Sequence, residues 1–316
     1  MARILIAGCG DVGATLGQSL SAAGHEVWGL KRHPADLPPG IQPLAADLTE
    51  PATLNALPPA LDAVVYSAAA AGFGEAAYQA AYVAGVRNLL DALRRAGQQP
   101  RRLLFTSSTS VYAQHQGEWV DEDSPAEAEG FSGRCIRAGE RLMWDSGWPA
   151  VVVRFGGIYG PGRTRLIDSV RAGTATRPAD PPLYTNRIHR DDCARVLEHL
   201  LFLPAPTPLY LAVDDDPAPL GEVLCWLARQ LGVPEPALTA NPPLKPGAGT
   251  GDPALRMRAS KRCRNARLRA SGFQFRYPGY RDGYAALLDA EGKPSPVARA
   301  AAPATGAAQS AAPAKS

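Results

Sequence analysis

The sequence predicts an α/β protein built on a doubly wound parallel sheet, with a smaller C-terminal lobe. In its first half, short apolar runs typical of buried strands alternate with segments of helical hydrophobic spacing, which is the pattern of βαβ units. A glycine-rich loop directly follows the first of these strands. The length of 316 residues fits two domains, or one large α/β domain with additions.

The expected elements follow in chain order. Apolar runs predict strands at residues 3–7, 26–30, 44–46, 63–67, 102–106 and 151–155, and helical spacing predicts helices at 12–23, 53–57 and 78–96. After Tyr159 the alternation loosens, and we expect a helix at 190–203, a strand at 209–213 and a helix at 220–231.

These elements suggest a domain division. We expect a main domain at 1–160, joined by a returning segment at about 186–215, and a small substrate lobe at 161–290. Residues 241–252 are rich in Pro and Gly and predict a surface loop. The Ala/Pro-rich tail at 293–316 has almost no large apolar residue, so we expect it to be disordered.

Composition excludes several classes of protein. With 46% hydrophobic and 20% charged residues, the chain is neither wholly disordered nor a coiled coil. It has no apolar run of about 18 residues, so no membrane span is expected, and its net charge of +3 is too small to indicate nucleic-acid binding. The five cysteines are scattered and form no C-x-x-C pair, so we expect no metal site and a cytoplasmic protein.

The loop after the first strand has the spacing G-x-G-x-x-G. Gly8 permits a tight turn, Gly10 lets a pyrophosphate approach the backbone, and Gly13 lets the following helix pack against the strand. This pattern predicts a Rossmann-like NAD(P)-binding domain, with Asp11 and Val12 also at the cofactor. A carboxylate at position 11 is unfavourable beside a pyrophosphate unless it points away. The alternative is a glycine-rich turn that binds no ligand.

The end of the second strand bears on the choice of cofactor. An acid there would bind the ribose 2′-hydroxyl of NAD, but the strand ends in Lys31 and Arg32, which suit the 2′-phosphate of NADP. NADP is therefore preferred to NAD, and the alternative is a solvated basic turn. Asp47 can reach the adenine or can simply form a turn. The segment after the fourth strand is also predicted to contact the cofactor through Ser67, Ala68 and Ala69.

Four segments carry a family resemblance: residues 82–90 (YVAGVRNLL), 105–112 (FTSSTSVY), 154–163 (RFGGIYGPGR) and 186–192 (NRIHRDD). In this order, over about residues 1–290, the chain resembles the extended short-chain dehydrogenases/reductases, the NAD(P)-dependent epimerase/dehydratase family. The resemblance implies a small-molecule substrate that reacts at a hydroxyl or carbonyl carbon, nucleotide-linked or phosphorylated substrates among them. It also implies a homodimer through the helices at 78–96 and 134–144. Ala7 stands where the family usually has the first glycine of its loop, which indicates an atypical branch.

The catalytic motif of the family is missing. The family uses a Tyr-x-x-x-Lys pair, in which the Tyr moves a proton and the Lys lowers its pKa. Here Ser132 stands at the Tyr position and Ile136 at the Lys position, and no Tyr or Lys lies between residues 114 and 145. An isolated serine hydroxyl is a poor acid or base near neutral pH.

The resemblance leaves four candidate catalytic residues. Ser108 matches the family's Ser/Thr position and can bond a substrate oxygen, or it can simply satisfy the end of a strand. Tyr112, Tyr159 and His189 are candidate replacement proton carriers. Alternatively, the two tyrosines serve packing and His189 serves the start of a helix.

Two sets of basic residues have open roles. Arg134 and Arg137 can bind the ribose or an anionic substrate, or can lie on a solvated helix face. The run from Arg256 to Arg269 is a solvated face, a clamp for an anionic substrate or, least favoured, a nucleic-acid contact.

Two functions follow from these residues. The first is an atypical NAD(P)-dependent oxidoreductase or epimerase. The second is a non-catalytic sensor or scaffold that binds NADP(H) or a metabolite.

Overall fold

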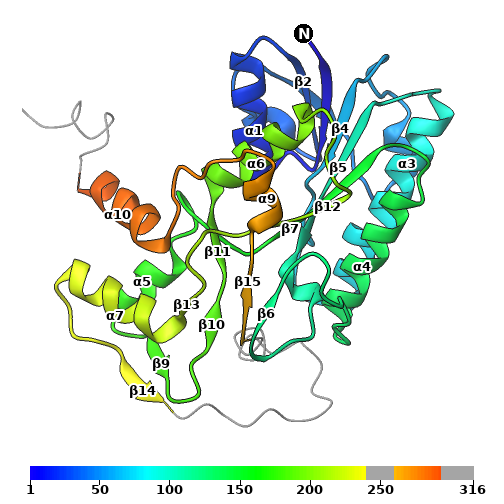
Figure 1. Cartoon of the computed structure of the whole chain (residues 1–316). Helices are drawn as coiled ribbons and strands as arrows, with labels where there is room; N and C mark the ends of the chain where they lie inside the picture. Colours follow the sequence, from blue (N-terminus) through cyan, green and yellow to red (C-terminus); the bar gives the residue numbers. More distant parts are fainter. Residues whose placement is uncertain (240–259, 293–316) are drawn as a thin grey trace, which may run out of the picture.

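The computed structural model describes residues 1–239 and 260–292, and its centre is a seven-stranded parallel sheet (Figure 1). The strand order is β12-β7-β5-β4-β1-β2-β3, and every neighbouring pair is parallel. The predicted α/β fold is thus confirmed. The strands are β1 (Arg3–Ala7), β2 (Glu26–Lys31), β3 (Ile41–Ala45), β4 (Ala63–Tyr66), β5 (Arg102–Ser108), β7 (Ala150–Phe155) and β12 (Leu209–Ala212).

Helices cover both faces of the sheet (Figure 1). One face packs against α1 (Asp11–Ala22) and α6 (Arg190–Phe202), whose Leu16 and Leu197 are fully buried. The other face packs against α3 (Gly85–Arg95) and α4 (Phe131–Trp144), with Leu89 and Ile136 in its core. The order of the strands reverses between β1 and β4, and open α/β sheets bind ligands in the crevice at this point.

The helix predicted at 78–96 is longer than expected and is interrupted. It runs as α2 (Glu75–Gln79), a π-helical turn (Ala80–Ala84) and α3. The buried hydroxyl of Tyr66 donates a hydrogen bond to the carbonyl of Ala81, which an undisturbed α-helix would use internally. This side-chain contact from β4 accounts for the wider turn. The helix expected at 53–57 is instead a 3₁₀ turn at Pro51–Leu54, with Pro51 in its first turn.

A second lobe lies beside the carboxyl edge of the sheet. It has its own core, which includes Ile167, Leu224 and Tyr284. Its helices are α5 (Arg165–Arg171), α7 (Leu220–Leu231) and α10 (Tyr280–Glu291), and the short α9 (Ala266–Ala270) contacts β12. Paired short strands complete this half of the molecule: β6 (Gln116–Val120) with β15 (Ser260–Cys263), β8 (Gly157–Tyr159) with β11 (Arg187–His189), β9 (Thr176–Pro178) with β14 (Ala237–Thr239), and β10 (Tyr184–Thr185) with β13 (Ala218–Pro219).

Two sequence predictions concern segments that the structure does not describe. The surface loop at 241–252 and the disordered tail at 293–316 both lie outside residues 1–239 and 260–292. Within those described ranges, no helix combines the length and apolar character needed to cross a membrane.

Candidate active site

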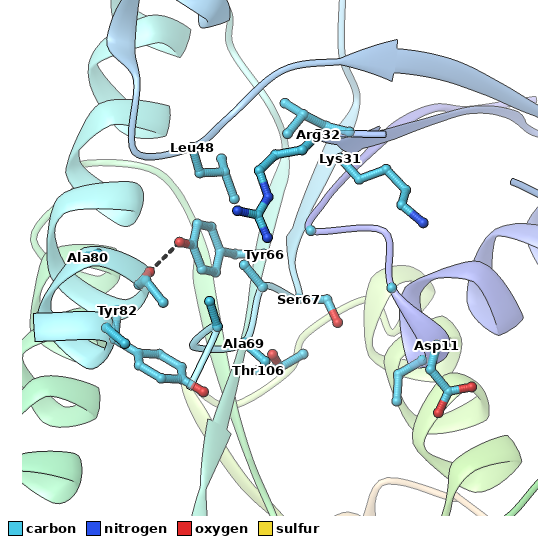
Figure 2. Close-up of a pocket in the computed structure, with 18 of the residues that line it drawn as sticks. Asp11, Lys31, Arg32, Leu48, Tyr66, Ser67, Ala69, Ala80, Tyr82 and Thr106 are labelled. Carbon is cyan, nitrogen blue, oxygen red and sulfur yellow. Dashed lines mark hydrogen bonds between the residues drawn. The ribbon is translucent and has the colours of Figure 1, made fainter. Parts of the chain in front are cut away.

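A cavity of about 730 Å³ opens at the carboxyl edge of the sheet, at the point where the strand order reverses (Figure 2). It gathers residues that are far apart in the sequence. The predicted residues that line it are Gly8, Gly10, Asp11, Val12, Lys31, Arg32, Asp47, Ser67, Ala68, Ala69 and Ser108. The strand ends and the first helix thus bring together ten of the eleven predicted cofactor residues, together with Ser108.

The three loop glycines have different surroundings. Gly8 has φ +84°, and a Cβ there would lie 2.4 Å from the Cα of Ala68. A Cβ at Gly13, which is buried beneath the cavity, would lie 2.9 Å from Cγ2 of Ile6. At Gly10 the nearest atom, the carbonyl oxygen of Gly8, is 4.0 Å away, so the cavity side of the loop is open. This geometry fits a pyrophosphate at the N-terminus of α1.

The two basic residues at the end of β2 point in different directions (Figure 2). Lys31 donates hydrogen bonds to both carboxylate oxygens of Asp36, at 2.7 and 3.0 Å. Arg32 extends over the cavity toward Tyr66 and Leu48 and forms no ion pair with any described residue. Arg32 is therefore better placed than Lys31 to meet an added phosphate.

The carboxylate of Asp47 is engaged locally. Its Oδ1 accepts hydrogen bonds from the backbone N–H of Thr49 at 2.9 Å and from the hydroxyl of Thr49 at 2.8 Å. These bonds hold the pKa of Asp47 below its ordinary value. The residue thus forms a turn while still lining the cavity, so both interpretations of the sequence are compatible with its position.

Ser108 lies at the end of β5, where its Oγ accepts a hydrogen bond from the backbone N–H of Ser110 at 3.1 Å. Its hydroxyl proton can therefore be donated to a ligand. The neighbouring Ser107 donates to Oε1 of Glu140 at 2.6 Å. Glu140 in turn forms a buried bidentate pair with Arg154, with both distances 2.8 Å. This network fixes the edge of the cavity to α4 and β7.

The three candidate proton carriers are not among the described residues that line the cavity. Tyr112 is buried; its hydroxyl donates to the carbonyl of Asp121 at 2.7 Å and accepts from Arg154 at 2.8 Å. Tyr159 packs in the second lobe, with its ring 4.4 Å from that of Tyr284. Burial raises the pKa of both tyrosines.

His189 serves the start of α6. Its Nδ1 accepts a hydrogen bond from the backbone N–H of Asp191 at 3.2 Å, and the side chain is 2% exposed. Burial lowers the pKa of His189 to about 4, so the imidazole is neutral at pH 7. Its geometry favours the alternative interpretation, a residue that begins a helix.

The altered α4 brings neither catalytic group of the family to the cavity. Ile136 is buried in the core behind the sheet, and Ser132 is half-buried on the same helix outside the cavity lining. Arg137 donates to the carbonyls of Ala126 and Ala128, at 2.6 and 3.1 Å. Arg134 donates to the carbonyl of Glu129 and pairs with Glu75. Both arginines thus hold neighbouring segments of the chain.

The described part of the basic run makes contacts within the protein. Arg262 lies 4.8 Å from the ring centres of both Trp119 and Tyr184. Arg267 pairs with Asp123, and Arg269 pairs with Asp215. Arg256 and Arg258 lie outside the described residues.

The cavity is also lined by residues to which the sequence assigned no role, among them Tyr82 and Arg163. Tyr82 belongs to the π-helical turn and lines the cavity (Figure 2). Arg163 follows β8 and donates from Nε to Oδ2 of Asp11 at 2.6 Å. Helical periodicity could not place Tyr82, because the π turn changes the phase of the helix. Arg163 lies in a segment that carries the family resemblance, but the motif itself assigns no role to this arginine.

The sequence is similar to those of known proteins. A family model described as the NAD dependent epimerase/dehydratase family matches residues 4–197. A 3-diazoavenalumate denitrifying reductase from a Streptomyces species is 31% identical over 303 residues, which are 89% of this chain and 98% of the relative.

Solved structures are similar over most of the chain. A putative NAD-dependent epimerase/dehydratase from Methylobacillus flagellatus is 39% identical, with a TM-score of 0.75, over 92% of this chain and 99% of its own. A human epimerase family protein solved with NADPH is 21% identical, with a TM-score of 0.74, over 91% of this chain and 99% of its own; at that identity it supports the fold alone.

Proposed function

Because the chain belongs to the NAD-dependent epimerase/dehydratase family, we propose that it is an NADP(H)-dependent reductase. Its substrate is a small electrophile whose reduction needs no proton from the Tyr–Lys pair of the family. This proposal is supported by a cavity that is lined by ten of the eleven predicted cofactor residues and by Ser108, combined with Ser132 and Ile136 at the two catalytic positions.

The described residues fit a dinucleotide phosphate in three ways. The open face of Gly10 admits the pyrophosphate to the start of α1, and Ala68 closes over Gly8 on the far side of the loop. Arg32 offers an unpaired guanidinium within the described part of the chain for the 2′-phosphate. Structurally similar proteins solved with NADPH or with NAD agree with this class of cofactor without deciding between the two.

The chemistry available is hydride transfer from the nicotinamide. Reduction of a ketone also requires a proton on the new alkoxide, which the family's tyrosine normally supplies. The described residues that line the cavity offer Ser108 as a hydrogen-bond donor at the family's Ser/Thr position. A cationic acceptor that loses a neutral group needs no such proton, because the negative charge of the hydride neutralises the positive charge of the acceptor.

A diazonium group is an acceptor of that kind. When hydride replaces it, a C–H bond forms, the C–N bond breaks, and the group leaves as neutral dinitrogen without a proton transfer. The name of the Streptomyces relative, a denitrifying reductase of a diazo compound, supports this class of substrate for the present chain. The roles left to the protein are to position the acceptor beside Ser108 and to exclude water.

The experiment is to incubate the protein with NADPH deuterated at C4 and an arenediazonium salt, and to follow the arene by mass spectrometry. The proposal expects deuterium in the arene at a rate well above that of a protein-free mixture, and expects Gly10→Ala to reduce it to that background. If the wild type binds NADPH but does not exceed the background, the reductase is contradicted for this substrate class.

A non-catalytic NADP(H)-binding protein is the second candidate. The loss of both halves of the Tyr–Lys pair favours it more than a single loss would. It predicts tight binding of NADPH without turnover of carbonyl, hydroxyl or diazonium compounds.

A further inference from the structure

Asp11 is the first residue of α1 and directly follows Gly10, so its carboxylate stands where the phosphates of a dinucleotide would approach. Taken alone, a negative charge at this place repels a pyrophosphate. In the structure the carboxylate is engaged by two arginines from distant parts of the chain. Arg163 Nε lies 2.6 Å from Oδ2, and Arg190 Nη1 lies 3.2 Å from Oδ1.

The two arginines differ in how much of their donor capacity is used. Arg190 also pairs with Asp191 through Nε and Nη2, at 3.1 and 2.9 Å. Arg163 gives only Nε to Asp11, and its two terminal nitrogens make no hydrogen bond to any described residue. A guanidinium has five N–H donors in one plane, so these two nitrogens can still donate two hydrogen bonds to an oxyanion.

Arg163 is also fixed at its backbone. It closes a turn after β8 in which its N–H donates to the carbonyl of Gly160 at 2.9 Å, and α5 begins two residues later. Its side chain is 43% exposed and lines the cavity, and it also borders a shallower hollow formed by residues 162–174. Arg163 thus belongs to the segment that leads into the second lobe, and its guanidinium lies next to the first residue of α1, directly after the glycine loop (residues 8–13).

We propose that Asp11 is a positioning residue that holds Arg163 beside the glycine loop, and that the terminal nitrogens of Arg163 bind the pyrophosphate of the cofactor. Arg163 and Arg190 together balance the charges of Asp11 and Asp191, so the carboxylate of Asp11 is compensated, and the two terminal nitrogens of Arg163 remain available for an anion. This inference rests on the proposed function, because it assumes a dinucleotide in the cavity.

The test compares NADPH, NADH and 2′-AMP as ligands of the wild type and of Arg163→Ala and Asp11→Asn. Both dinucleotides contain the pyrophosphate, and 2′-AMP does not. Arg163→Ala is expected to lower the affinities for NADPH and NADH by the same factor, roughly 10- to 100-fold for a charge-assisted pair of hydrogen bonds. The affinity for 2′-AMP should be unchanged. Unchanged 2′-AMP binding also shows that the variant is folded.

The variant Asp11→Asn shows whether the carboxylate of Asp11 strengthens or weakens dinucleotide binding. If Asp11 positions Arg163, the variant binds both dinucleotides several-fold more weakly, and the double variant is no weaker than Arg163→Ala alone. If Asp11 merely repels phosphate, Asp11→Asn binds NADPH more tightly, which overturns the inference, as does equal affinity. If the wild type binds none of the three ligands, the proposed function itself fails, whatever the variants do.

Discussion

Replacing Gly10 with alanine separates cofactor binding from folding. The added Cβ would have as its nearest neighbour the carbonyl oxygen of Gly8 at 4.0 Å, and the φ of −86° at this position suits any residue. The protein core therefore gives no reason for a glycine here. A ligand gives one, because the methyl group would point into the space through which the pyrophosphate reaches the loop.

We therefore expect Gly10→Ala to change the free energy of unfolding little and the affinity for NADPH strongly. Alanine is a poorer N-terminal cap than glycine but restricts the unfolded chain, so the free energy of unfolding should change by less than about 1 kcal/mol. NADPH affinity should fall at least ~100-fold, which is about 2.7 kcal/mol. The matched control is Gly13→Ala, whose Cβ would lie 2.9 Å from Cγ2 of Ile6. Overpacking there should cost about 1–3 kcal/mol of stability.

The assay is a titration of nicotinamide fluorescence, with stability measured by urea denaturation of the same samples. We expect the free energy of unfolding of Gly10→Ala to stay within about 1 kcal/mol of the wild type and its NADPH affinity to fall at least ~100-fold, whereas Gly13→Ala should be less stable. Wild-type affinity for NADPH in Gly10→Ala would refute the assignment of this loop to the pyrophosphate.

Three further predictions follow from single contacts. Arg32→Ala should weaken NADPH roughly 10- to 100-fold and leave NADH nearly unchanged, since only NADPH carries the 2′-phosphate; equal losses would remove the preference for NADP. Glu140→Gln leaves the buried guanidinium of Arg154 without its counter-charge and should lower the free energy of unfolding by about 3 kcal/mol in urea denaturation; a loss below about 1 kcal/mol would show that water reaches the pair. The pKa of His189 is lowered to about 4 from an ordinary 6.5, so the unfolded chain takes up the proton first as the pH falls. The free energy of unfolding should then decrease between pH 6.5 and 4, by up to about 3 kcal/mol, and His189→Asn should flatten that decrease; an unchanged slope would contradict the buried neutral imidazole.

The sheet and the glycine loop were predictable because their signals are local. The apolar run of β1, the glycines at 8, 10 and 13, and the helix that follows are contiguous, and alternation of strands and helices restricts the topology to few choices. The same locality explains why the candidate cofactor residues at the ends of β1, β2 and β4 could be placed at one edge of the sheet.

The details of the site depend on contacts between distant segments. The π turn that carries Tyr82 contains the carbonyl that accepts a hydrogen bond from Tyr66, and the role proposed for Asp11 depends on Arg163, which is 152 residues away. Motif position suggested Tyr112 and His189 as proton carriers, but the packing of Arg154 and the start of α6 place them inside the protein. Sequence spacing carries no information on such pairings.

The most direct measurement is a titration of the purified wild-type protein, freed of nucleotide, with NADPH and then with NADH. An NADP(H) site at this cavity predicts saturable NADPH binding in the micromolar range, roughly tenfold or more tighter than NADH because Arg32 meets the 2′-phosphate. A folded, nucleotide-free protein that binds neither dinucleotide would contradict the account.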